Sequence, residues 1–203
     1  MLSSIHPFGE RSRNNAFSQT AAAHVLGSIL GGLALGLVAG GVGVVLLSVV
    51  SIPVEVRTGL IVAVAGVATI LEATKRERLF PTRTRQVNEN WIQNYRGWVY
   101  GGGFGAELGF GISTIITTTL IHVLVLAMVL LGNLGAALIL GALFGAVRGA
   151  TVLAAAGVDS PEQLRNFHQR LDQLRSRSRA GAVVSLATAT AIGLAAISGI
   201  GAI

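Results

Sequence analysis

Residues 100–133 read YGGGFGAELGFGISTIITTTLIHVLVLAMVLLGN, and this stretch decides the fold class. Glu107 and His122 are its only acidic or basic side chains. An apolar run of more than 18 residues predicts a helix that crosses a membrane. This run is longer than the ~20 residues that one straight crossing needs. The stretch therefore predicts a transmembrane helix that breaks, tilts or extends into the headgroup layer.

The composition of the whole chain points to the same class. Of its 203 residues, 52% are hydrophobic and only 12% are charged, about half of the ~25% that is usual for soluble domains. We therefore expect an all-α, polytopic integral membrane protein. There is no cysteine, so disulfides, thiolate nucleophiles and cysteine metal sites are excluded.

The hydropathy pattern predicts five transmembrane spans in one domain. Residues 1–20 form a polar N-terminal tail, and residues 21–203 form a single transmembrane helical domain. The first apolar run is too long for a signal-peptide core and is interpreted as an uncleaved span. The predicted spans are 22–50, 57–74, 99–131, 134–157 and 181–203.

Basic residues are concentrated in two islands, 75–98 and 159–179, with two more arginines in the N-terminal tail. Cytoplasmic loops carry an excess of Lys and Arg. With five spans, this predicts a multi-pass protein of the cytoplasmic membrane, with its N-terminus and both islands in the cytoplasm and its C-terminus outside. The islands also account for the net charge of +6, so no nucleic-acid partner is expected.

Both islands have the pattern of surface helices. Ser160-Pro161-Glu162-Gln163 is a capping box, and an apolar stripe of leucine and phenylalanine follows on a basic helix, which suits the headgroup layer. The first island carries an aromatic stripe. We expect contact with anionic lipid headgroups, whereas ordinary connecting helices packed on the bundle are the alternative. The predicted contact residues are Trp91, Trp98, Arg165, Arg170 and Arg175.

A series of elements repeats along the chain. A long glycine-rich helix, a short loop, a second helix and an amphipathic island begin near residue 23, and the same series begins near residue 101. A truncated third copy begins near residue 179. With two crossings per unit, the copies would run parallel to one another.

Glu107 is the strongest candidate for a functional group, because a carboxylate inside a span is costly unless it is paired or hydrated. Arg148 on the fourth span is counted to a similar depth from the cytoplasmic side. An ion pair is therefore expected. A structural pair that locks two helices, a pathway for a solute or ion, and separate snorkelling to the interface all remain open.

Four polar residues form one face of the third span. Glu107, Thr114, Thr118 and His122 are separated by 7, 4 and 4 positions, which places them along one side of a helix. Such a face needs either a partner helix or water. It either lines a path in which His122 titrates near neutral pH or makes helix contacts through hydrogen bonds.

The glycines suit close helix packing and give no sign of a nucleotide site. Gly105-x-x-x-Gly109 and Gly27-x-x-x-Gly31 have the spacing of small-residue helix contacts. No phosphate-binding loop or metal-ligand spacing occurs in the sequence. We therefore expect no catalytic residues, no metal and no cofactor, and we do not expect an enzyme.

The segments RQVNENWIQNYRGWVYGGGFGAELGFG (85–111) and GALFGAVRGATVL (141–153) resemble bacterial membrane proteins of the cytochrome c biogenesis transmembrane region (CcdA/DsbD type). That family conducts reducing equivalents through two intramembrane cysteines, one of them beside a proline in its first helix. This sequence has neither those cysteines nor a proline in its first span. The resemblance thus implies a related membrane fold without the thiol chemistry.

Two functions fit these features. The first is a small transporter-like protein that moves a small solute or ion along the stripe with Glu107, His122 and Arg148. The alternative is a non-catalytic membrane scaffold, or a subunit of a larger membrane complex, with a membrane protein or a second copy as its partner. The two differ in whether the polar stripe faces water or is sealed against neighbouring helices.

Overall fold

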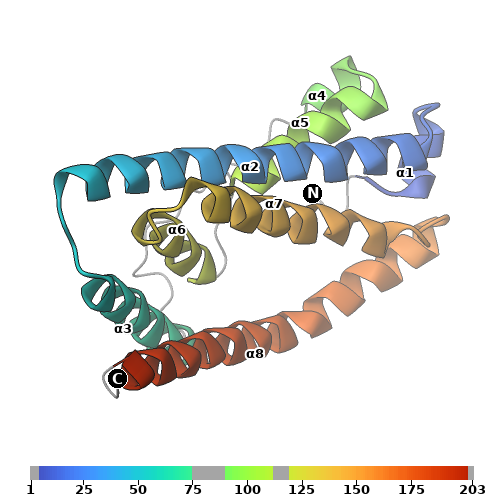
Figure 1. Ribbon diagram of the computed structural model, residues 1–203. Helices are drawn as coiled ribbons and strands as arrows, with labels where there is room; N and C mark the ends of the chain where they lie inside the picture. Colours follow the sequence, from blue (N-terminus) through green and yellow to red (C-terminus); the bar gives the residue numbers. More distant parts are fainter. Residues whose placement is uncertain (1–4, 75–89, 112–118, 201–203) are drawn as a thin grey trace. The chain divides into compact units, whose positions relative to one another are not determined.

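A computed structural model describes residues 5–74, 90–111 and 119–200 of the chain. All regular structure in these three ranges is helical (Figure 1), which confirms the predicted all-α class. The helices, in chain order, are α1 (Pro7–Ser12), α2 (Phe17–Val49), α3 (Val54–Ala73), α4 (Asn90–Asn94), α5 (Gly97–Phe110), α6 (Leu120–Leu130), α7 (Leu134–Ala150), the 3-10 helix η2 (Thr151–Ala155) and α8 (Pro161–Ile200).

Four of the described helical segments are long and apolar enough to cross a membrane. They are Phe17–Val49, Val54–Ala73, Leu134–Ala155 and Arg177–Ser198. These segments correspond to the predicted spans 22–50, 57–74, 134–157 and 181–203. The first helix begins earlier than predicted, at Phe17, because the polar residues before position 22 still form helix.

The predicted third span, 99–131, is not one continuous helix. Helix α5 ends at Phe110, and the next residue, Gly111, has a φ of 73°, a left-handed conformation that glycine adopts at little cost. Helix α6 begins at Leu120 and contains 11 residues. Each piece is shorter than the ~20 residues of a full crossing. Of the three alternatives for this long run, the structure therefore supports an interruption.

The second basic island and the last span form one helix. Helix α8 contains 40 residues, whereas the sequence predicted separate helices at 161–179 and 181–203. The capping box is confirmed, because the Gln163 amide donates to the Ser160 hydroxyl and the Gln163 side chain accepts from the Ser160 amide. Gly181 alone does not end the helix, since a single glycine costs only ~1 kcal/mol there.

The described residues form two compact units. The first comprises described residues within 1–35, 83–115 and 138–174, and the second comprises those within 36–82, 116–137 and 175–203. The core of the first unit holds Tyr100 and Phe104 of α5, both buried, together with Ile5, Ala21 and Val152. Trp91 of α4 stacks on Phe104 with 6.2 Å between ring centroids.

In the first unit, α5 crosses α2 at glycines. A Cβ atom built on Gly109 would collide with the Ser28 carbonyl oxygen, and one on Gly105 would collide with that of His24. In the reverse direction, Gly31 meets the Ala106 carbonyl and Gly27 meets the Gly102 carbonyl. These two small-xxx-small pairs are therefore the contact surface, as the spacing predicted.

The crossing has the symmetry of a repeat. His24 and Gly102 are 78 positions apart, and so are Gly27 and Gly105. The contact Gly27–Gly102 therefore has an equivalent in the contact Gly105–His24, with the two helices exchanged. The same offset relates Gly31–Ala106 to Gly109–Ser28. Contacts advance in the same direction on both helices, so the helices run parallel. This geometry agrees with the repeat of about 78 residues that was predicted from the order of elements.

The second unit has its own buried cluster of small and branched side chains. Ala65 and Ala68 of α3 pack with Val123 of α6 and Leu186 of α8. A Cβ on Gly193 of α8 would collide with Val62 of α3. Helix α3 therefore packs closely against both α6 and α8.

Candidate functional site

The N-terminal residues of the first unit fold into a short helix that carries a buried acid. Pro7 suits the first position of α1, since its missing N–H would have no helical partner. The His6 Nδ1 accepts a hydrogen bond from the Gly9 amide at 3.1 Å and caps the helix. Burial lowers the pKa of His6, and the Arg13 charge lowers this pKa further. The neutral ring that the cap requires is thus favoured.

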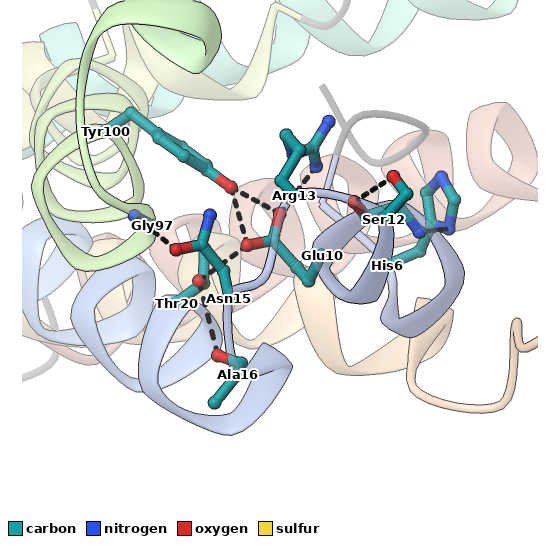
Figure 2. Close-up of polar contacts among 10 residues, drawn as sticks. His6, Glu10, Ser12, Arg13, Asn15, Ala16, Thr20, Gly97 and Tyr100 are labelled. Atoms are coloured by element: carbon teal, nitrogen blue, oxygen red, sulfur yellow. Dashed lines mark hydrogen bonds and ion pairs between the residues drawn. The ribbon is translucent and has the colours of Figure 1, made fainter.

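Glu10 is the centre of the site, and its carboxylate is fully buried. Figure 2 shows Arg13, Thr20 and Tyr100 converging on it from three elements. The Arg13 guanidinium lies 2.6 Å from one oxygen, and the Thr20 hydroxyl donates to the other at 2.8 Å. The Tyr100 hydroxyl lies 2.5 Å from both. The carboxylate is therefore saturated with charge-assisted hydrogen bonds.

These bonds tie α1 and the start of α2 to the first turns of α5. Asn15 adds a further connection, because its Oδ1 accepts from the Gly97 amide at 3.3 Å. Gly97 has no room for a side chain, since a Cβ there would collide with the Thr20 hydroxyl. The backbone reaches this position through Asn14, whose φ of 58° is left-handed, a conformation that asparagine tolerates better than most residues.

A polar pocket of about 210 Å³ opens beside this network. It lies where α2 and α5 begin, and we call it the Arg96 pocket. Its lining contributes one guanidinium, three carboxamides, one hydroxyl and one indole. The lining residues are Asn14, Asn15, Ala16, Gln19, Thr20, Arg96, Gly97 and Trp98.

A second buried carboxylate lies in the second unit. Glu72, in the last turn of α3, is 1% exposed. Its Oε2 accepts from the Thr119 amide at 3.1 Å and from the Thr119 hydroxyl at 3.0 Å. Thr119 precedes α6, so a negative charge sits at the positive end of that helix.

The residues predicted for a solute path are divided between the two units. Glu107 on α5 and Arg148 near the end of α7 both belong to the first unit, whereas His122 on α6 belongs to the second. Thr114 and Thr118 lie outside the described residues. Glu107 is two positions from both Gly105 and Gly109, so it lies on the face of α5 opposite α2. Its pairing with Arg148 stays a prediction.

The predicted membrane-contact residues differ in their surroundings. Arg165 and Arg170 are exposed on α8, and Arg175 belongs to the same helix. Trp98 is 59% exposed. Trp91, by contrast, packs on Phe104 and over Gly103, so part of its ring is used within the unit.

Sequence reasoning missed both buried carboxylates. Glu10 belongs to a stretch that was predicted as a polar tail, and Glu72 was counted at the end of an apolar span. One signal was available for Glu10, namely an acidic residue three positions before Arg13, a spacing that pairs charges on a helix. Its partner Tyr100 is 90 residues away, and no local pattern indicates that contact.

In both units, a buried carboxylate connects segments of the chain that are distant in sequence. Each buried acid is held by neighbouring donors of its own unit. Within the described residues, no group of three or more His, Asp or Glu side chains could hold a metal ion.

Comparisons with known proteins place the chain near one group of curated proteins. It is 32% identical over 145 residues to the methylamine utilization protein MauF of Paracoccus versutus, which covers 70% of this chain and 52% of that protein. MauF of Methylorubrum extorquens is 31% identical over 152 residues, covering 73% of this chain and 51% of the relative. The chain thus spans about half the length of the curated relatives it matches.

The other comparisons gave no match. No protein-family model matches the sequence, and no solved structure matches it. The resemblance to the CcdA/DsbD type is therefore wrong, because the similar proteins are MauF sequences and none is of that type. The physical reason is that glycine-rich helix texture and an arginine between small residues are properties of many membrane helices.

Proposed function

We propose that the protein is a non-catalytic membrane scaffold or subunit that takes part in methylamine utilization. The similarity to MauF supports the assignment to this process, since the name of those relatives refers to methylamine utilization. The four membrane-length helices support a place in the membrane. We further propose that the apolar stretch 99–131 provides a fifth crossing, as its length and hydropathy predict.

The observation that carries the scaffold proposal is the helix crossing around Ser28 of α2. Gly105 and Gly109 of α5 meet the Ser28 backbone, and so does Gly145 of α7. A Cβ on Gly149 of α7 would lie 2.8 Å from the Ser28 Cβ. Such contact leaves no room for even a methyl group at these glycines around Ser28, and close backbone packing of this kind favours a fixed assembly over a hydrated path.

Cysteine accessibility tests this function against the transporter alternative. The chain has no native cysteine, so single cysteines at Glu107 and His122 report their own surroundings. We expect both to react with a small water-soluble thiol reagent in native membranes no faster than a cysteine at the fully buried Ala137. A cysteine at the exposed Gln163 serves as the reactive control. Rapid reaction at both Glu107 and His122 would overturn the scaffold proposal in favour of a solute path.

The same chemistry tests the proposed topology of five crossings. Asn133, between α6 and α7, should be labelled from outside the cell, and Asp159, before α8, only from the cytoplasm. The reason is the concentration of Arg and Lys around Asp159 and in the first island. Labelling of Asn133 only after the membrane is opened would contradict this orientation.

A further inference from the structure

The Arg96 pocket has the size and charge of a site for a small anion. Its volume of about 210 Å³ exceeds several times the ~30 Å³ that one water occupies in the liquid. Behind the pocket, Glu10 and Arg13 form an ion pair at 2.6 Å. Their opposite charges cancel, so this pair adds no net charge beside the pocket. Among the lining residues, Arg96 carries the charge, and it is positive.

The lining also matches the geometry of one class of anion. A guanidinium is planar and binds phosphate oxygens through two parallel N–H bonds. Asn14 and Gln19 are exposed and line the same pocket, and each carries a carboxamide whose NH₂ group can donate to an anion. Glu10, the nearby acid, is fully buried behind Thr20 and Gly97 and is already bonded to its own donors. It therefore does not compete for Arg96.

The position of the pocket favours a phospholipid as the source of such an anion. The pocket lies where the apolar helix α2 begins at Phe17 and where α5 begins at Gly97. Trp98, with 59% of its surface exposed, is part of its lining. Tryptophan is enriched at the membrane–water interface, and tryptophan and arginine anchor helices there, at the depth of the phospholipid phosphates.

We propose that the Arg96 pocket binds the phosphate of an anionic phospholipid headgroup, with Arg96 as its main ligand and Asn14 and Gln19 as additional donors. This inference rests on the membrane location given under the proposed function. It goes beyond that function because it assigns a specific lipid site to a pocket of the first unit, where the exposed Arg96 lies beside further donors.

Native mass spectrometry of the full chain in detergent tests this site. The probes are phosphatidylglycerol, phosphatidylcholine, a diacylglycerol without phosphate, and inorganic phosphate alone. We expect one phosphatidylglycerol retained per chain, with about tenfold weaker retention of phosphatidylcholine, whose choline charge opposes Arg96, and none of the diacylglycerol. Displacement of the lipid by millimolar inorganic phosphate would overturn the lipid assignment and identify a free phosphate site.

Arg96→Gln and Gln19→Leu test the lining, and Arg165→Gln, at an exposed arginine of α8, is the control for loss of charge. Arg96→Gln should weaken phosphatidylglycerol retention about tenfold, Gln19→Leu should weaken it less, and Arg165→Gln should leave it within about twofold. Equal retention by Arg96→Gln and wild type would overturn the proposal.

A carbonate wash separates this inference from the proposed function. If the wild-type protein stays in the membrane pellet but shows no selective lipid retention, the pocket proposal alone fails. If the wash releases the protein into the supernatant, the proposed membrane location is wrong, and the lipid site that rests on it is wrong as well.

Discussion

Gly109→Ala is expected to destabilise the protein by about 3 kcal/mol or more, the upper end of what overpacking usually costs. The added methyl group would collide with the Ser28 carbonyl oxygen of α2. A backbone oxygen in the middle of a helix cannot rotate away as a side chain does. The two helices must therefore separate, and their other close contacts are lost together.

Gly41→Ala is the matched control, because a Cβ there has nothing within 4 Å. This substitution also lies in a helix, and we expect it to be neutral or to stabilise by up to ~1 kcal/mol, since alanine favours helix over glycine. The measurement is thermal unfolding in detergent, followed by loss of the monodisperse peak in size-exclusion chromatography.

Gly31→Ala tests the symmetry of the crossing. Gly31 meets the Ala106 carbonyl as Gly109 meets that of Ser28, so the two substitutions should cost similar free energies. If Gly109→Ala unfolds at the same temperature as Gly41→Ala, the α2–α5 contact does not hold the first unit together.

The same glycines show how much of the fold the sequence could predict. Their spacing and the length of the apolar runs were sufficient for the all-α class and for the four membrane-length helices of the described residues, because both signals are local. The interruption at Gly111 was one of three alternatives. Choosing among them requires the backbone angle at one glycine, and in this stretch that angle depends on what the helix packs against.

The candidate site was harder to predict for a physical reason. Glu107 stood out because it interrupts an apolar run, whereas Glu10 lies in a polar stretch where an acid costs nothing until the chain folds over it. Its burial depends on Tyr100 and Thr20, which come from other helices. Hydropathy measures the average environment of a segment and contains no information on such a contact.

Glu10→Ala is expected to cost about 3 kcal/mol, the lower end of the range seen when one partner of a buried ion pair is removed, because the Arg13 side chain is 29% exposed and can reach solvent. The substitution leaves the Arg13 guanidinium and the Thr20 and Tyr100 hydroxyls without their shared acceptor. Glu55→Ala, at an exposed acid in the first turn of α3, should change stability by no more than ~0.5 kcal/mol.

Limited proteolysis separates loss of the Glu10 contacts from general unfolding. When α1 is released from α5, trypsin gains access to the bonds after Arg11 and Arg13, so Glu10→Ala should be cut there much faster than wild type. In thermal unfolding, Glu10→Gln/Arg13→Gln should recover part of the stability lost by Glu10→Gln or by Arg13→Gln alone, since removing both charges leaves neither one unpaired. Cleavage of Glu10→Ala at the rate of Glu55→Ala would mean that the carboxylate does not hold the N-terminal helix, and that α1 stays in place through the packing of Ile5 and its neighbours alone.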